Sequence, residues 1–295
     1  MKTTRRHFIR SSVFLGTGVL SKPFNRFEIA AEAGKFLEKI GVCTGITNNG
    51  ILASAGFSYV EEAVRNFLVP AEDESVFQGK RALLKESRLP VEACNNFVPG
   101  NLKAVGPAAA HDDILKFAEM ALRRAEIAGV KTIVFGSGGS RAIPEGYSRE
   151  KAREQFIDLC KRMMPLAEKY HVVVSLEPLN SQECNFINSV AEGGGIVEAV
   201  NHENFRLLAD IYHMLREKES PSNISRYAHF LYHMHIAENA GRSAPGVNKE
   251  DFTAYFRALK DAKYEGRMSI ECNWKSLEEQ AGPALKTIRG QLSTI

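Results

Sequence analysis

The sequence has few cysteines, and their spacing matches neither a disulfide framework nor a cysteine-based metal motif. The 295 residues contain five cysteines, an odd number, at positions 43, 94, 160, 184 and 272. No Cys-x-x-Cys pair occurs among them. Small disulfide scaffolds and zinc ribbons both depend on closely spaced, paired cysteines, so the sequence excludes these two classes.

The chain also lacks a strong surplus of either charge. It carries 38 Lys plus Arg against 35 Asp plus Glu, a formal net charge of +3. Residues 1–33 contain six of the basic and two of the acidic residues, which leaves 32 basic and 33 acidic residues for the remainder. A body this close to neutral lacks the concentrated basic face that electrostatic nucleic-acid binding requires, so we expect no nucleic-acid partner.

The apolar run near the N-terminus is too short to span a membrane as a helix, which takes about 20 residues. This run, residues 12–20, follows the segment Thr-Arg-Arg-His-Phe-Ile-Arg at 4–10 and precedes Ala-Glu-Ala at 31–33. Paired arginines, an apolar run and small residues in this order are typical of a twin-arginine export signal. We therefore predict a signal peptide over residues 1–33 and a periplasmic mature protein without a membrane span. A cytosolic protein with a basic N-terminus is the alternative.

From residue 39 onward, short β-rich runs alternate with stretches of helical spacing. Apolar residues recur at three- and four-residue steps in 112–128, 149–170 and 248–262, which predicts helices there. No linker or low-complexity segment divides the chain. Repeated βα units favour an α/β fold with a parallel sheet, and eight of them in this length favour a single-domain (β/α)8 TIM barrel over residues 34–295. An open doubly wound sheet is the runner-up. The predicted strands are 39–46, 58–64, 89–98, 131–136, 172–179, 205–211, 234–237 and 267–272.

Polar residues stand at the ends of four successive predicted strands in the second half of the chain. Glu177, Asp210 and Glu271 each follow an apolar run, and His235 alternates with His233 in the seventh strand. Chemistry in a (β/α)8 barrel sits at the C-terminal ends of its strands, so we expect these groups to converge. Three carboxylates and one imidazole would suit Mn²⁺, Mg²⁺, Co²⁺ or Zn²⁺. Each residue taken alone could equally cap a helix or pair with a surface cation.

The two histidines of the seventh strand are interpreted differently from each other. Because His233 and His235 alternate along the strand, we expect only one to point into the barrel and the other to pack outside.

The glycine-rich segment 135–141 after the fourth strand could cradle a phosphate. It lacks the lysine of a P-loop, and a tight turn that needs glycine explains it at least as well.

Three local motifs resemble the xylose isomerase-like barrel superfamily, most closely its ketose 3-epimerase and hydroxypyruvate isomerase branch, over residues 39–294. They are Glu177-Pro178-Leu179-Asn180 with Glu183, Asp210-x-x-His213, and His235-Ile236-Ala237-Glu238 followed by Arg242 and Pro245-Gly246. The resemblance implies one bound divalent metal ion, with Mn²⁺ favoured. Its implied metal ligands are Glu177, Asp210, His235 and Glu271, and its implied substrate contacts are Glu183, His213 and Arg242.

This residue set suits proton transfer beside a sugar carbonyl. A divalent metal stabilises the enediolate, and two carboxylates on opposite sides of a carbon can remove a proton and return one. We assign these catalytic roles to Glu177 and Glu271. The expected partner is a small-molecule sugar, and a homo-oligomer is compatible with the sequence. Epimerisation and aldose–ketose isomerisation share this apparatus, so the sequence does not separate them.

Two other functions are compatible with the same fold. A barrel that binds sugar without turnover would keep the fold and lose the chemistry. An apurinic endonuclease of the endonuclease IV kind would need several histidines on the early strands. Between residues 34 and 170 the chain has only His111, which makes the endonuclease the less favoured reading.

The export signal predicts a change of location when its arginines are replaced. The double variant Arg5→Lys, Arg6→Lys should leave the folded protein in the cytoplasm, because the twin-arginine pathway reads the arginine pair. Fractionation followed by immunoblotting measures this. Uncleaved wild-type protein in the cytoplasmic fraction would contradict the export prediction.

Overall fold

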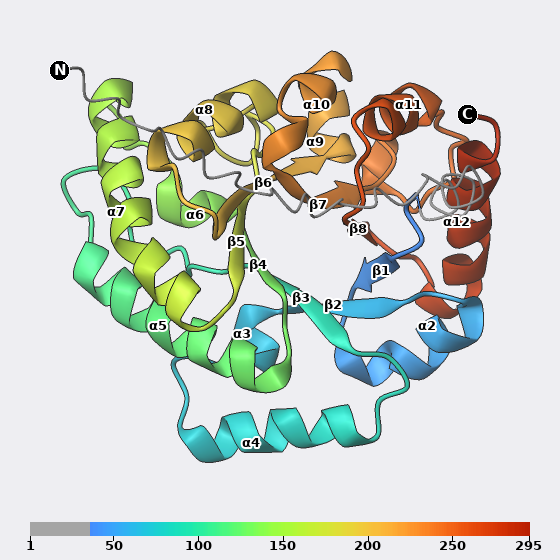
Figure 1. The fold of residues 1–295 in the computed structure, drawn as a ribbon, viewed down its shortest axis with the longest axis horizontal. Coiled ribbons are helices and arrows are strands. Elements are labelled where there is room, and N and C mark those ends of the chain that lie inside the picture. Colours follow the sequence, from blue (N-terminus) through green and yellow to red (C-terminus); the bar gives the residue numbers. More distant parts are fainter. Residues whose placement is uncertain (1–35) are drawn as a thin grey trace, which may run out of the picture. The chain divides into compact units, whose positions relative to one another are not determined.

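Eight parallel strands close into a barrel in the computed structural model, which describes residues 36–295. The strands follow one another around the barrel in chain order (Figure 1), so the prediction of an α/β, single-domain (β/α)8 barrel is confirmed. The predicted signal peptide, residues 1–33, lies outside the described residues. The strands are β1 (Ile40–Cys43), β2 (Tyr59–Ala63), β3 (Val91–Asn95), β4 (Thr132–Phe135), β5 (Val173–Leu176), β6 (Phe205–Asp210), β7 (Leu231–Ile236) and β8 (Arg267–Ile270).

The barrel closes through β1, which pairs in parallel with both β2 and β8. Val42 lies opposite Val60 on one side and Ile270 on the other, and all three side chains are buried. A closed sheet leaves no unpaired edge, and it brings the C-terminal ends of all strands to one mouth. The open-sheet alternative is therefore wrong.

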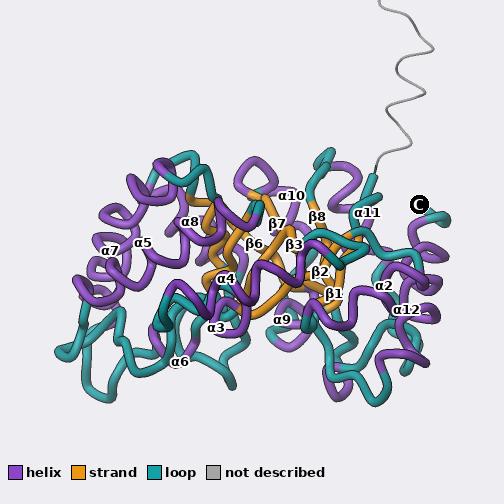
Figure 2. Tube along the Cα trace, turned by 90° about the horizontal axis from the view of Figure 1, so that it is seen from below, coloured by secondary structure: helices purple, strands orange, loops and turns teal. Residues whose placement is uncertain are grey.

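Helices surround the strands, which lie in the middle of the molecule (Figure 2). None of the helices within residues 36–295 combines the length and the apolar character that crossing a membrane requires. The helices are α2 (Asn49–Ala55), α3 (Val64–Phe67), α4 (Glu74–Ala82), α5 (His111–Ala128), α6 (Gly138–Arg141), α7 (Arg149–Lys169), α8 (Val190–Val200), α9 (Ile211–Arg216), α10 (Ser222–Arg226), α11 (Thr253–Asp261) and α12 (Leu277–Leu292).

Helix α7 shows how the local sequence specifies an outer element. The Ser148 side chain accepts a hydrogen bond from the Lys151 backbone N–H at 3.2 Å, which caps the first turn. The apolar stripe predicted from the spacing is buried against the barrel and its neighbours. It includes Phe156, Leu159, Cys160 and Met163, all with no exposed surface.

One predicted helix begins later than its apolar spacing indicates. The spacing predicts residues 248–262, but α11 covers only Thr253–Asp261. The buried carboxylate of Glu238 accepts the backbone N–H groups of Gly246, Asn248 and Glu250, which holds this stretch in a loop. The Glu238 carboxylate thus competes with helix formation for these backbone N–H groups, and α11 starts only after the last of them.

The expectation that only one histidine of β7 points into the barrel is wrong. His233 and His235 are both fully buried, and both contact the carboxylate of Glu61 on β2. Side chains two residues apart in a strand lie on the same face, so these two histidines share the interior side. The strand itself also starts three residues earlier than predicted, at Leu231.

Arg141 joins the ends of two strands to the loop that follows β5. Its side chain has no exposed surface, and its guanidinium donates to the carbonyl oxygens of Gly136 at 2.6 Å and of Glu177 at 2.7 Å. A third bond reaches the carbonyl of Phe186. One buried cation therefore satisfies backbone acceptors directly after β4, directly after β5 and in the adjoining loop, and this fixes the position of the Glu177 backbone.

We expect Arg141→Met to lower the free energy of unfolding by about 3 kcal/mol or more, because it leaves buried carbonyl oxygens without donors. Urea unfolding monitored by circular dichroism measures this. The matched control is Arg153→Met at an exposed arginine that makes a single bond, to the Gly195 carbonyl. The control should change stability by no more than about 0.5 kcal/mol. Equal stability of the two variants would contradict the role given to Arg141.

Candidate metal and active site

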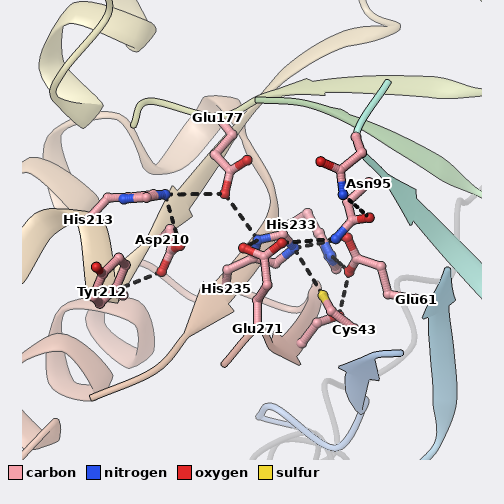
Figure 3. Close-up of polar contacts among 12 residues, drawn as sticks. Cys43, Glu61, Asn95, Glu177, Asp210, Tyr212, His213, His233, His235 and Glu271 are labelled. Atoms are coloured by element: carbon pink, nitrogen blue, oxygen red, sulfur yellow. Dashed lines mark hydrogen bonds and ion pairs between the residues drawn. The ribbon is translucent and has the colours of Figure 1, made fainter. Parts of the chain in front are cut away.

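Four side chains from successive strands meet at the C-terminal mouth of the barrel (Figure 3). Glu177 follows β5, Asp210 ends β6, His235 lies near the end of β7, and Glu271 follows β8. Ligand atoms of the four lie within 4.8 Å of one another. The first three are buried, and the Glu271 side chain is 22% exposed. The structure thus brings together all four residues that the resemblance implies as metal ligands.

His235 lies at the centre of this group. Its Nδ1 atom is 3.1 Å from Glu177 Oε1 and 3.4 Å from Glu271 Oε2, while its Nε2 atom is 3.0 Å from Glu61 Oε1. Burial by itself lowers the pKa of this imidazole. The surrounding carboxylates of Glu61 and Glu271 outweigh burial and raise the pKa of His235 well above its usual value.

The three carboxyl groups of the cluster differ in their electrostatic surroundings. Burial raises the pKa of Glu177 above its usual value and the pKa of Asp210 to about 6. Burial acts in the same direction on Glu271, but His235 and Arg242 overcome it and hold the pKa of Glu271 at about 2. Burial therefore disfavours the ionised forms of Glu177 and Asp210, and a bound cation would stabilise these forms.

Two buried polar atoms in the cluster have no hydrogen-bond partner. They are Asp210 Oδ2 and His213 Nε2, which lie 3.4 Å apart. Asp210 uses its other oxygen to accept the backbone N–H of Tyr212 at 2.8 Å, which caps α9. A buried carboxylate oxygen without a partner is costly, and a cation at this point would satisfy it. The residues present therefore fit a divalent metal ion.

The orientation of the His213 ring follows from its neighbours. Its Nδ1 atom accepts from the Asn180 backbone N–H at 3.2 Å and from the Asn180 amide at 2.9 Å. We therefore assign the ring proton to Nε2, which points toward Asp210 and Glu177. The same Asn180 amide donates to Glu183 Oε1 at 2.8 Å. The implied substrate residues His213 and Glu183 are thus held by one asparagine.

Arg242 brings a permanent positive charge to the cluster. Its guanidinium pairs with Glu271 and lies 3.7 Å from Asp210 Oδ2 and 3.6 Å from Glu183 Oε1. It also stacks over the Tyr212 ring, 4.8 Å from the ring centre. This arginine connects Asp210 and Glu271 with Glu183 at the rim. The structure therefore places all three implied substrate residues at the same mouth.

A cavity of about 500 Å³ opens above the cluster, within the size range of small-molecule sites. Of the four converging residues, Glu177 and Glu271 line this cavity. Trp274 does not line it but packs against the core. The lining includes Glu177, Glu183, His213, Arg242 and Glu271, together with Asn95, Asn96 and the backbone of Gly136–Gly139.

The glycine-rich segment after β4 leaves room for the Glu177 carboxylate. A Cβ atom on Gly136 would collide with Oε2 of Glu177, and one on Gly138 would come within 3.1 Å of the Glu183 carbonyl oxygen. The segment continues into the single-turn helix α6, whose last residue is the buried Arg141. These contacts favour the tight-turn reading of this segment over a phosphate cradle.

Sequence reasoning missed one residue that touches the cluster, Glu61 on β2, which is fully buried beneath His235. Asn95, whose place at the end of the third strand suggested from sequence a contact to a substrate hydroxyl or a capped loop, donates to Glu271 Oε1 at 2.9 Å and lines the cavity. The signal for Glu61 was present as an acidic residue inside the predicted strand 58–64. Alternation places Glu61 on the inner face and Glu62 on the outer face, where Glu62 accepts the backbone N–H of Ile46 at 2.8 Å.

These observations define the class of protein: a closed parallel barrel with carboxylates and histidines gathered at the C-terminal ends of its strands. The xylose isomerase-like TIM barrel family matches residues 50–291. The chain therefore belongs to this family.

Similarity to characterised proteins covers most of the barrel. An L-ribulose 3-epimerase of Methylomonas sp. (strain DH-1) is 27% identical over 263 residues, covering 80% of this chain and 88% of the relative. A D-psicose 3-epimerase of Ruminiclostridium cellulolyticum is 31% identical over 40% of this chain and 40% of the relative. The structure of D-psicose 3-epimerase with D-tagatose from Clostridium cellulolyticum H10 covers 86% of this chain and 99% of that chain at 21% identity, with a TM-score of 0.74. At that identity the structural likeness shows the shared fold.

Proposed function

We propose that this protein is a metal-dependent sugar epimerase or isomerase that acts on a ketose or related sugar by proton transfer through an enediolate. The observation that carries the proposal is the convergence of Glu177, Asp210, His235 and Glu271, whose ligand atoms lie within 4.8 Å of one another at the mouth of the barrel. Glu177 and Glu271 also line the cavity. The epimerases among the relatives support the reaction class. An assay of turnover on a panel of ketoses identifies the substrate.

The four converging residues would hold one divalent ion, with Mn²⁺ favoured and Mg²⁺, Co²⁺ or Zn²⁺ as alternatives. Such an ion, when bound, acts as a Lewis acid that stabilises negative charge on the oxygens beside the reacting carbon. Carboxylate oxygens and one imidazole form a ligand set that all four ions accept.

Glu177 and Glu271 are the proposed proton-transfer groups. They project from the ends of β5 and β8, which are separated around the barrel by β6 and β7, and both line the cavity. One carboxylate takes the proton from the carbon next to the carbonyl, which leaves an enediolate. Delivery of a proton to the opposite face by the other carboxyl group gives the epimer. Delivery to the former carbonyl carbon, together with transfer of the hydroxyl proton to the former carbonyl oxygen, gives the isomer instead.

Three further residues would hold the substrate in place. The Nε2–H group of His213 and the guanidinium of Arg242 can donate to substrate oxygens near the reacting carbon, since both line the cavity. Glu183, which is 39% exposed, can accept a hydrogen bond from a hydroxyl group farther out. Positioning of this kind lowers the barrier by fixing the reacting carbon between the two carboxyl groups.

The proposed place of action is the periplasm, on the basis of the twin-arginine pattern at residues 4–10. Phosphorylated sugars are mainly cytoplasmic, so export favours a free sugar or sugar derivative as substrate. The tight-turn geometry of the glycine-rich segment supports the same preference.

We expect the protein to need a divalent cation for both stability and turnover. Treatment with a chelator should abolish turnover of ketoses, and Mn²⁺ should restore it. At a free Mn²⁺ concentration 100 times the dissociation constant, binding should stabilise the fold by about 2.7 kcal/mol, which raises the melting temperature. Differential scanning fluorimetry with and without each ion measures this. Sugar binding without turnover under any of the four ions would instead favour the non-catalytic barrel.

Replacing Glu271 by Gln should keep the fold and remove proton transfer. We expect turnover, and deuterium uptake from D₂O at the substrate carbon, to fall by at least about 100-fold, because an amide is not a proton acceptor. Proton NMR of the ketose that the wild type converts fastest measures both. Glu265→Gln, at an exposed glutamate, is the matched control and should exchange normally. Undiminished exchange in Glu271→Gln would remove this residue from the mechanism.

A further inference from the structure

A second polar cluster lies inside the barrel, directly beneath His235. Glu61 on β2 has no exposed surface and does not line the cavity, so it does not contact a substrate there. Its Oε1 atom is 3.0 Å from His235 Nε2, and its Oε2 atom is 2.7 Å from His233 Nε2. Ser269 on β8 donates its hydroxyl to Oε2 at 2.6 Å. Three donors from two strands therefore converge on one carboxylate.

The Ser269 hydroxyl, one of the donors to Glu61, is itself oriented by Tyr59. Because the Ser269 hydroxyl donates to Glu61, the Tyr59 hydroxyl must donate to Ser269, at 2.8 Å. Tyr59 and Ser269 are both fully buried. The network runs from β2 through β8 back to β2 and ends on His235, so the position of the Glu61 carboxylate is determined from several sides.

The two nitrogens of the His235 ring face different surroundings. Nδ1 faces the mouth, where Glu177 and Glu271 gather, and Nε2 faces Glu61 in the interior. A ring nitrogen that binds a cation carries no proton, so Nδ1 must be bare in the metal-bound protein. The proton then sits on Nε2, and this requires an acceptor on the interior side. Glu61 is that acceptor.

We propose that Glu61 is a positioning residue for the metal centre, which selects the Nε2–H form of His235 and aims its bare Nδ1 at the cation. A carboxylate behind a metal-binding histidine fixes the tautomer and orientation of the ring and makes it a stronger ligand. This role rests on the proposed metal-dependent function, and it adds a residue from β2 that does not reach the cavity.

A second cation bound among Cys43, Glu61 and His235 is the competing interpretation, since their ligand atoms also lie within 4.8 Å of one another. The contacts argue against it. Both oxygens of Glu61 already have donors, and the Cys43 thiol is 4.0 Å from His235 Nε2. Two buried atoms without a hydrogen-bond partner, Asp210 Oδ2 and His213 Nε2, lie on the mouth side. The unpartnered atom on the interior side, His233 Nδ1, belongs to none of the three residues that would bind the second cation.

The test measures metal affinity, which does not depend on turnover. Metal-free full-length protein is titrated with Mn²⁺ by isothermal calorimetry, for the wild type, Glu61→Gln and Glu92→Gln. Glu61→Gln should bind Mn²⁺ about 10- to 100-fold more weakly, the usual loss when an outer partner of a metal ligand is removed. The control, Glu92→Gln, removes a carboxylate that pairs with Arg267 and Lys39 at the start of β3. It should bind like the wild type.

Each outcome decides a different point. Tight Mn²⁺ binding by the wild type with unchanged affinity in Glu61→Gln would overturn the role of Glu61 and leave the metal centre standing. Absence of binding by the wild type to any of the four ions would overturn the metal centre and the role of Glu61 together. Equal losses in Glu61→Gln and Glu92→Gln would assign the effect to general destabilisation, which also overturns the proposal.

A conservative variant covers the case in which Glu61→Gln does not fold. Glu61→Asp keeps the charge but shortens the side chain by one methylene group, so it cannot reach both histidines. Its Mn²⁺ affinity should fall below that of the wild type, and the visible spectrum of its Co²⁺ form should shift because His235 is held differently. Wild-type affinity together with a wild-type Co²⁺ spectrum would contradict the proposal.

Discussion

Burial of ionisable groups is the constraint on which the rest of this structure depends. The barrel encloses the carboxylates of Glu61, Glu177 and Asp210 with almost no exposure, beside the partly covered Glu271. Each buried charge is costly unless a cation or hydrogen-bond donors meet it. His235 lies between Glu61 and the mouth carboxylates, where it serves both groups. The arrangement of the surrounding donors follows from this requirement.

Two layers of side chains inside the barrel differ in how their buried charges are matched by donors or cations. In the interior layer the chain supplies donors to both oxygens of the Glu61 carboxylate, from His233, His235 and Ser269. In the layer at the mouth the chain leaves Asp210 Oδ2 and His213 Nε2 without hydrogen-bond partners. A carboxylate with all its donors makes a rigid support, and an oxygen without a donor makes a place for a ligand. This difference between the two layers explains why we place the proposed metal site and its chemistry at the mouth.

The loops at the mouth hold the site because buried contacts fix them to the barrel. Arg141 collects carbonyl oxygens from the ends of β4 and β5, and the absent side chain of Gly136 leaves space for the Glu177 carboxylate. Asn180 sets the positions of both His213 and Glu183. Functional loops on a rigid scaffold keep reacting groups in place while remaining open to substrate.

Local patterns in the sequence were enough to identify the barrel fold and the four residues that converge at its mouth. Alternating β-rich and amphipathic stretches are properties of neighbouring residues, so eight βα units can be recognised before any fold is known. A carboxylate directly after an apolar run identifies a strand end in the same way, as at Glu177, Asp210 and Glu271. The family resemblance then implied the roles of Glu183, His213 and Arg242, and the structure places all three around the cavity.

Tertiary structure alone decided which residues support the site. Glu61 and His235 are 174 positions apart, and only closure of the barrel brings β2 across from β7. The same holds for Asn95 and Glu271, which are 176 positions apart. The late start of α11 likewise depends on Glu238, whose carboxylate takes backbone donors that the spacing assigned to a helix. Contacts between distant segments are set by the geometry of the closed sheet, and no short stretch of sequence encodes that geometry.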